Sequence, residues 1–386
     1  MQSILGNISK EDFLKNYWQK KPLVIRGAFP DFEMPFTPEE LAGLACDTDA
    51  PSRIVSENGF EPKHSLNSKQ WDSKQSPFTD EDFTSLPDTH WTLLVNDLER
   101  YIPELGNIIE QFRFIPDWRI DDVMVSYAPD QGSVGPHTDQ YDVFLIQGQG
   151  KRHWKIITRD DYPTQLINGP SLAILKEFKA DEEYLLEAGD MIYLPPNMPH
   201  YGIAEGECFT FSVGFRAPDS TDLIQNWVDS TFTKTERYSD AGRTLQSSSG
   251  EISRNDIQKL SQLMLSKIQE QQGNLSIFLG KHLTQSKGET PVDEDLLASL
   301  SFNPKEEYQR ESWLRFAFTE DKEENTVHFF ADGHHVKLKS KNLNAVKELC
   351  ENYVYGAETL QALATNKAFK SLFTLLIREG GISLAG

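Results

Sequence analysis

Basic residues and cysteine are both scarce in this chain of 386 residues. It has 38 Lys and Arg against 59 Asp and Glu, which gives a formal net charge of −21. Such a charge repels phosphate backbones and anionic lipids, so we expect no general binding to nucleic acid or to a membrane surface. The three cysteines, Cys46, Cys208 and Cys350, lie far apart in the sequence. This spacing argues against a disulfide framework and against a cysteine-rich zinc site.

Long apolar runs are also missing. No stretch approaches the roughly 20 apolar residues that span a bilayer, and the first residues lack the basic and then apolar pattern of a secretory signal. We therefore expect a cytoplasmic protein with reduced thiols. The hydrophobic fraction of 38% is enough for a packed core, and the length predicts two or three domains.

The chain changes character along its length. Residues 1–218 begin with mixed helix and strand patterns and continue, from about residue 121, as short apolar strands separated by glycine and proline turns. This pattern predicts an antiparallel barrel or sandwich. Residues 219–285 have apolar side chains at helical spacing, and residues 286–386 combine a β-hairpin with helices. We expect these three segments to be three domains.

Some local predictions follow within these segments. Gly148 and Gly150 predict a turn between two strands, at 141–147 and 151–158. The polar, serine-rich stretch 240–256 predicts a mobile loop. In the last segment we expect a helix at 296–302 and two further helices, which begin at Asn342 and Glu358.

Three side chains in the strand-rich segment could bind a metal. His137 and Asp139 stand just before an apolar strand, and on a strand residues i and i+2 point to the same side. His200, which follows Pro195 and Pro196, would complete a set of two histidines and one carboxylate. That set leaves one face of the metal open and is the facial triad of non-haem Fe(II) oxygenases. Each part alone is common in proteins without a metal, so the prediction depends on the combination.

A candidate anion anchor follows the triad's first two members. Strand alternation places Arg152, Trp154 and Ile156 on one face. An arginine on this apolar face would point inward and need an anionic partner, and the carboxylate of 2-oxoglutarate is one such partner. The alternative is a basic strand that faces solvent. Ser212 could donate its hydroxyl to the same carboxylate or be an ordinary core serine.

The segments that carry these residues resemble the bacterial JmjC-type ribosomal oxygenases. The resemblance is most specific in GPHTDQYDVFLIQGQGKRHWKI (135–156), GDMIYLPPNMPHYG (189–202) and FSVGFRAP (211–218). It covers nearly the whole chain, although the last third matches mainly by architecture. The resemblance implies an α+β fold: a JmjC/cupin double-stranded β-helix, then a helical dimerisation region, then a C-terminal winged-helix-like domain.

The resemblance also implies an activity. Members of this family use Fe(II), with 2-oxoglutarate and O₂ as cosubstrates, and release succinate and CO₂. The bacterial branch hydroxylates the β-carbon of an arginine side chain in protein sixteen of the large ribosomal subunit. His137, Asp139 and His200 match the family's iron ligands. Arg152 matches the basic residue that holds the 2-oxoglutarate carboxylate.

Candidates for substrate contacts are weaker. Asp130 lies seven residues before His137 and could bind a substrate arginine, although an aspartate here could equally support a turn. Tyr127 and Tyr141 could line the entrance of the barrel, and core packing is the alternative for both.

The remaining segments bear on partners. Apolar stripes within 257–283, together with the resemblance, predict a homodimer. Residues 287–386 carry 12 Lys and Arg against 16 Asp and Glu, so we expect no DNA binding by the C-terminal domain. The acidic chain would attract a basic ribosomal protein, free or nascent. Two alternatives stay open: a metal-dependent cupin enzyme that does not use 2-oxoglutarate, and a non-catalytic, ribosome-associated binding module.

Overall fold

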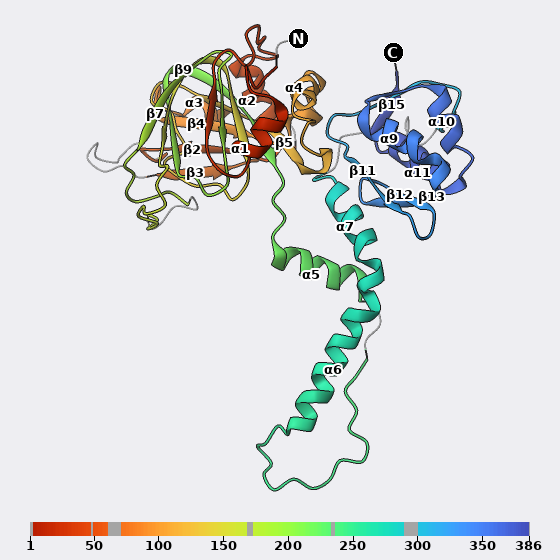
Figure 1. Ribbon diagram of the computed structural model, residues 1–386. Coiled ribbons are helices and arrows are strands. Elements are labelled where there is room, and N and C mark those ends of the chain that lie inside the picture. The colour runs from red at the N-terminus through yellow and green to blue at the C-terminus, as the bar shows by residue number, and fades with distance from the viewer. Residues whose placement is uncertain are drawn as a thin grey trace. The chain divides into compact units, whose positions relative to one another are not determined.

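The structure, a computed structural model, describes residues 3–47, 49–60, 71–167, 173–232, 236–288 and 300–385 (Figure 1). The chain divides into two compact units. Unit 1 consists of Met1–Ala217 with Glu311–Trp313, and unit 2 of Pro218–Arg310 with Leu314–Gly386. Unit 2 thus holds both the helical segment and the C-terminal elements, and a further division near residue 285 stays a prediction.

Unit 1 is built on a nine-stranded antiparallel sheet. Its strands are β1 (Leu23–Ile25), β2 (Ser52–Ser56), β3 (Asp72–Gln75), β4 (Trp91–Val95), β5 (Ile120–Ala128), β6 (Val143–Ile156), β7 (Glu182–Glu187), β8 (Met191–Leu194) and β9 (His200–Phe215). Their order is β1-β8-β6-β9-β5-β4-β2-β3, and β7 also pairs with β6. The long strands β6 and β9 therefore lie at the centre, where strands cover both of their edges.

Helices cover one side of this sheet. They are α1 (Lys10–Asn16), α2 (Pro38–Asp47), α3 (Asp80–Thr84) and α4 (Gly106–Gln111), with 3₁₀ turns at Leu98–Arg100, Pro103–Leu105 and Asp117–Arg119. Phe13 of α1 is buried, and its ring lies 5.5 Å from that of Phe144 and 5.0 Å from that of Tyr193. We call this side the outer face, because a second apolar cluster lies on the opposite side of β6.

The inner face is defined by that second cluster. Its buried members are Val143, Leu145, Trp154, Ile156, Leu186, Ile192 and Leu194. Directly paired residues of neighbouring antiparallel strands point to the same face. His200 pairs with Ile156 and Ser212 pairs with Leu145, so both point to the inner face. The inner face therefore carries predicted site residues from both central strands.

The predicted turn at Gly148 and Gly150 is wrong, because β6 continues through both residues. The pairing of β6 with β9 shifts twice, between Gln147 and Gln149 and between Gln149 and Lys151. Gly150 has a φ of +68°, and a Cβ there would lie 2.1 Å from the carbonyl oxygen of Glu207. Glycine thus allows a bulge in place of a turn. The bulge shifts the alternation of side chains along β6. Odd-numbered residues point inward before the bulge, and even-numbered residues point inward after it.

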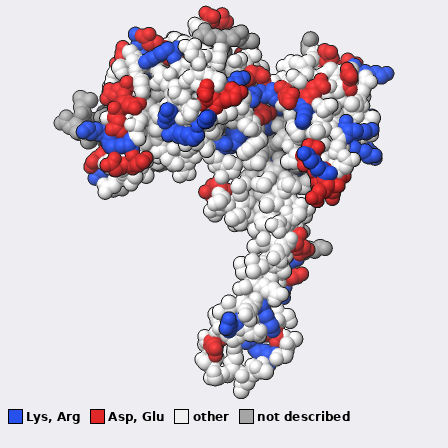
Figure 2. Space-filling view, in the orientation of Figure 1, with Lys and Arg blue, Asp and Glu red and all other residues white. Residues whose placement is uncertain are grey.

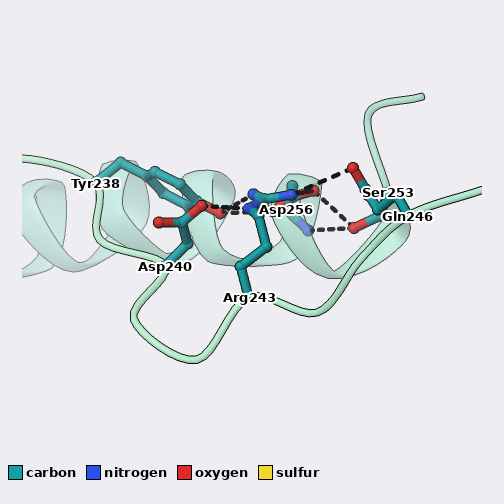
Figure 3. A network of polar contacts seen from close by, with 6 residues as sticks. All are labelled: Tyr238, Asp240, Arg243, Gln246, Ser253 and Asp256. Atoms are coloured by element: carbon teal, nitrogen blue, oxygen red, sulfur yellow. Dashed lines mark hydrogen bonds and ion pairs between the residues drawn. The ribbon is translucent and has the colours of Figure 1, made fainter. Parts of the chain in front are cut away.

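Unit 2 begins with helices. They are α5 (Ser220–Thr231), α6 (Arg254–Gln271) and α7 (Leu275–Thr284), with a 3₁₀ turn at Gln272–Asn274. The stretch 240–256, predicted as a mobile loop, has an ordered set of polar contacts around Arg243 (Figure 3). Its guanidinium contacts the carboxylates of Asp240 and Asp256, and the Tyr238 hydroxyl donates to Asp256 at 2.5 Å. Ser253, which caps α6, also donates to Asp256, at 2.7 Å. The loop is therefore tied to the first turn of α6.

The C-terminal part of unit 2 has two small antiparallel sheets. One contains β11 (Phe316–Asp321), β12 (Thr326–Ala331) and β13 (His334–Lys339), and the other β14 (Val354–Tyr355), β10 (Tyr308–Arg310) and β15 (Ile382–Leu384). After a 3₁₀ turn at Ser340–Asn342, three helices follow where two were predicted: α9 (Leu343–Glu351), α10 (Ala357–Leu363) and α11 (Lys367–Arg378). Asn366 lies between α10 and α11 and caps the start of α11. The helix predicted from Glu358 is therefore two helices. The helix predicted at 296–302 lies largely outside the described residues.

Across the described ranges, no helix has the length and apolar character needed to cross a membrane.

A pair of stacked imidazoles in unit 2 predicts acid sensitivity. The rings of His328 and His335 lie 5.0 Å apart and nearly parallel, with Nδ1 of His328 2.8 Å from Nε2 of His335. Burial first, then His328 and two lysines, lowers the pKa of His335 to about 4, and burial lowers that of His328. A single hydrogen bond between two imidazoles requires one of them to be neutral.

We therefore expect the pair to stabilise unit 2 at pH 7 and to lose that contribution as the pH falls below about 6.5 and through 4, since the unfolded chain binds more protons over that range. NMR titration of the histidine resonances measures the pKa of His335 directly, and the variant His335→Gln assigns its resonance. A His335 that titrates near pH 6.5 would contradict the prediction.

Candidate active site

The three predicted metal ligands come together in unit 1. Nε2 of His137 lies 3.8 Å, and Nε2 of His200 3.6 Å, from Oδ2 of Asp139. The two imidazole rings are 4.3 Å apart, and one ligand atom from each residue lies within 4.8 Å of the others. These spacings place two nitrogens and one oxygen around a single point, as a facial triad requires.

The backbone holds the two ligand-bearing segments together. The amide of His137 donates to the carbonyl of His200 at 3.0 Å, and the amide of His200 donates to that of His137 at 2.9 Å. Asn197 has a φ of +62°, and its backbone amide donates a hydrogen bond to the backbone carbonyl of Asp139 at 2.6 Å. The loop before β9 is therefore fixed to the loop before β6, and the triad does not depend on side-chain contacts alone.

Hydrogen bonds also set the orientation of both imidazoles. Nδ1 of His137 donates to the carbonyl of Gly135 at 2.9 Å, and Nδ1 of His200 donates to that of Met198 at 2.9 Å. With Nδ1 protonated, a neutral imidazole has its lone pair at Nε2, which is the atom that faces Asp139. Burial first, and then the neighbouring His137, lowers the pKa of His200 to about 4. His200 is therefore neutral at physiological pH, as metal binding requires.

The structure places Arg152 on the inner face, as predicted. Arg152 is only 4% exposed, and its register partners are Leu186 of β7 and Ala204 of β9. Nη1 donates to the hydroxyl of Ser126 at 3.4 Å, while Nε and Nη2 are buried and have no partner among the described residues. Within the same ranges Arg152 makes no ion pair with a carboxylate. A buried guanidinium with two unpaired donors indicates that an anion binds here.

Ser126 is a site residue that sequence reasoning missed. It pairs with Thr210, and Met124, two residues earlier on β5, pairs with Ser212. Ser126 and Ser212 are therefore on the same face of the sheet, and both are buried. A polar residue in the otherwise apolar run of β5 was the available signal. Arg152 contacts the hydroxyl of Ser126 and not that of Ser212, so the role of Ser212 in anion binding stays a prediction.

The three candidate substrate contacts lie in different surroundings. Asp130 accepts a hydrogen bond from the amide of Gly206 at 2.8 Å, which lowers the pKa of its carboxyl group. Tyr127 belongs to the outer face, where its ring lies 5.6 Å from Trp91 and 5.1 Å from Phe209. Tyr141 is 41% exposed, two residues after Asp139. Packing accounts for the contacts of Tyr127, whereas Asp130 and Tyr141 have groups that a substrate could reach.

A second polar cluster supports the loop that carries Asp139. The carboxylate of Asp142 is fully buried and accepts hydrogen bonds from Tyr193 at 2.6 Å, Gln19 at 2.9 Å and Arg119 at 3.3 Å. The hydroxyl of Tyr193 also accepts a hydrogen bond from the backbone amide of Gln19 at 2.8 Å. These contacts join the start of β6 to β8 and to the chain after α1. No local pattern in the sequence indicates this cluster, because its members are more than 20 residues apart.

Removing the Tyr193 hydroxyl tests this cluster. We expect Tyr193→Phe to lower the free energy of unfolding by about 1.5–3 kcal/mol, because a buried carboxylate then loses a hydrogen bond. Denaturant titration of both proteins measures the difference. Tyr162→Phe, which removes an exposed hydroxyl that makes only a 3.5 Å contact, is the matched control. Equal stability of Tyr193→Phe and the wild type would contradict the prediction.

These residues fit a divalent metal together with an anion. Two imidazoles and one carboxylate are a donor set typical of non-haem iron and leave coordination positions open. The unpaired donors of Arg152 lie on the same inner face as His200. A dicarboxylate could bind the metal at one end and the guanidinium at the other.

Comparison with protein families and curated proteins agrees with this geometry. The model of the JmjC domain matches residues 107–223, and that of the AraC-like ligand binding domain matches residues 179–283. The ribosomal protein uL16 3-hydroxylase of Escherichia coli is 34% identical over 284 residues, which cover 73% of each chain. A probable ribosomal oxygenase of Haemophilus influenzae is 42% identical over 221 residues, 56% of this chain, and the match spans about half (52%) of that relative's length.

Solved structures extend the similarity to nearly the whole chain. Escherichia coli YcfD matches with a TM-score of 0.77 and 30% identity over 98% of this chain and 99% of that one. A structure of YcfD in complex with cobalt and 2-oxoglutarate matches over the same shares with a TM-score of 0.74. This agreement confirms the predicted JmjC/cupin fold.

Proposed function

The chain belongs to the JmjC-domain ribosomal oxygenases, and from this premise we propose that it is an Fe(II)- and 2-oxoglutarate-dependent protein hydroxylase. Its substrate would be a ribosomal protein of the large subunit, and the name of the Escherichia coli relative points to uL16. The reaction would hydroxylate the β-carbon of an arginine side chain and release succinate and CO₂. The observation that carries the proposal is a facial triad beside a buried arginine that has no anionic partner within the described chain.

Each residue of the site would have a separate role. His137, Asp139 and His200 hold the iron, with both imidazoles fixed by hydrogen bonds to backbone carbonyls. Bound Fe(II), with 2-oxoglutarate as electron donor, supplies the activation of O₂. Arg152 holds the far carboxylate of 2-oxoglutarate, supported by Ser126 and, by proposal, Ser212. An enzyme without 2-oxoglutarate would leave the buried charge of Arg152 unexplained.

Exposure indicates the side from which substrate enters. The side chains of His137 and Asp139 are 23% and 24% exposed, whereas that of His200 is 4% exposed. Substrate would therefore approach past His137 and Asp139, near Tyr141. Asp130, whose lowered pKa keeps it ionised, could bind the guanidinium of a substrate arginine. Tyr127, which was also predicted, packs on the outer face and has less support.

The charge of the chain fits such a substrate. Acidic side chains are spread over the visible surface of both units (Figure 2), and the net charge is −21. This field would steer a basic ribosomal protein toward the enzyme before ribosomal RNA neutralises it. We propose that the enzyme acts in the cytoplasm on the free or nascent protein.

Mass spectrometry of the product tests the proposed reaction. We expect a recombinant uL16-type protein, incubated with the enzyme, Fe(II), 2-oxoglutarate and O₂, to gain the mass of one oxygen atom on one arginine, with an equal amount of succinate. His137→Ala should abolish both products, because it removes a metal ligand. The exposed substitution His153→Ala serves as a control and should keep the activity, since His153 contacts Glu205 on the strand's other face. Oxidation that survives His137→Ala would contradict the proposal.

We further propose that the protein is a homodimer through its helical segment. Several apolar side chains of α5 and α6 are exposed: Ile224, Val228, Ile257, Leu260, Met264, Leu265 and Ile268. Figure 2 shows a largely uncharged surface over this segment. Apolar surface of this extent on a helix is typical of an interface. The contacts of Arg243 would hold the adjoining loop in one conformation for the partner (Figure 3).

Light scattering coupled to size exclusion tests the dimer. We expect the wild type to elute with twice the mass of the chain, and Met264→Asp with Ile268→Asp to weaken association at least about tenfold, because each change buries an unpaired charge. Gln258→Asp, on a polar position of the same helix, should leave the dimer intact. A monomeric wild type, or a dimer unchanged by the double substitution, would contradict this proposal.

A further inference from the structure

Trp154 lies close to both the predicted cosubstrate anchor, Arg152, and one member of the triad, His200. It lies on the inner face of β6, two residues after Arg152, and is 5% exposed. Its ring centre is 5.8 Å from Cζ of Arg152 and 5.9 Å from the ring centre of His200. A molecule that bridges the metal and Arg152 would therefore pass along the indole.

The neighbouring strand is shaped to admit this ring. Trp154 pairs with Gly202 of β9, and a Cβ on Gly202 would lie 2.7 Å from indole carbons Cζ3 and Cη2. Only glycine at this position lets the benzo edge of the indole rest on the backbone. Nε1 is on the opposite, pyrrole edge of the ring and so lies away from Gly202. The close approach fixes the orientation of the ring beside His200.

The indole Nε1–H has no hydrogen-bond partner among the described residues, although it is buried. Buried tryptophan N–H groups usually find one, and leaving such a donor unpaired costs about 1–3 kcal/mol. Nε and Nη2 of Arg152 are unpaired in the same way. Three unpaired donors thus lie on two adjacent inward-facing residues. Such a cluster matches a ligand with several acceptor oxygens, which a dicarboxylate has.

We infer that Trp154 is a further cosubstrate-binding residue: its indole forms the wall of the 2-oxoglutarate site between Arg152 and His200, and its Nε1–H donates a hydrogen bond to a carboxylate oxygen of the cosubstrate. The inference rests on the proposed function. It assigns Trp154 a role in affinity for the dicarboxylate that is separate from metal binding, which the triad performs.

NMR of the wild type tests the hydrogen bond directly. The full-length protein, labelled with ¹⁵N at its seven tryptophan indoles and loaded with Zn(II), is titrated with 2-oxoglutarate. One indole N–H resonance should move downfield, and it should be the resonance that is absent from Trp154→Phe. If calorimetry shows that 2-oxoglutarate binds but no indole resonance moves downfield, the inference is overturned. This test needs only the wild type, so it holds even if no variant folds.

Calorimetry on Co(II)-loaded protein gives the energetic test. Trp154→Phe keeps an aromatic wall but lacks the donor, so its affinity for 2-oxoglutarate should fall about tenfold, as for a hydrogen bond to a charged group, while its affinity for Co(II) stays within twofold of the wild type. Gly202→Ala, which displaces the indole, should also weaken 2-oxoglutarate binding. Trp91→Phe is the matched control, because its Nε1 already donates to the carbonyl of Pro87 at 2.6 Å.

The outcomes separate the inference from the proposed function. A wild type that binds Co(II) but not 2-oxoglutarate removes the proposed function itself. A wild type that binds 2-oxoglutarate, with Trp154→Phe equal to it, overturns only the role of Trp154. If Trp154→Phe loses Co(II) and 2-oxoglutarate binding together, the indole only supports His200, which also overturns the inference.

Discussion

The buried positive charge of Arg152 is the constraint on which this account depends. Among the described residues, the guanidinium of Arg152 is 4% exposed and makes a hydrogen bond to a serine hydroxyl but none to an anion. Such a charge destabilises the folded chain, because its desolvation is not offset. An anion that binds to Arg152 would stabilise the folded state, and the protein would bind that anion with correspondingly high affinity. The same inner face carries His200, so an anion at Arg152 and a metal at the triad would lie on one side of the sheet. A dicarboxylate that chelates iron meets both requirements at once.

The rest of unit 1 holds this arrangement in place. The bulge at Gly150 turns the later part of β6 so that Arg152 and Trp154 point inward. The paired backbone bonds between His137 and His200 join two segments that are far apart in sequence. On the outer face, Phe13 of α1 packs on Phe144 of β6 and Tyr193 of β8. The helices therefore stabilise the site without contributing to its chemistry.

The triad and Arg152 could be predicted because each depends on a local rule. Alternation along a strand predicted His137 with Asp139, and Arg152 with Trp154. The structure brings the first two together in the loop before β6, and the second two share the inner face of β6. The turn at Gly148 and Gly150 was predicted wrongly because the same glycines allow either a turn or a bulge, and only pairing with β9 decides between them. The cluster of Asp142, Tyr193 and Gln19, and the contact of Ser126 with Arg152, depend on strands far apart in sequence. Alternation within one strand carries no information on such contacts.

We expect Arg152 to bind one carboxylate of a dicarboxylate whose other end binds the metal. Calorimetric titration of 2-oxoglutarate into Co(II)-loaded wild type and Arg152→Met measures this most directly, because methionine keeps an unbranched side chain without the charge. We expect Arg152→Met to lose roughly 10- to 150-fold in 2-oxoglutarate affinity, because charge-assisted hydrogen bonds are removed, and to keep its affinity for Co(II). Equal affinity of the two proteins for 2-oxoglutarate would contradict it.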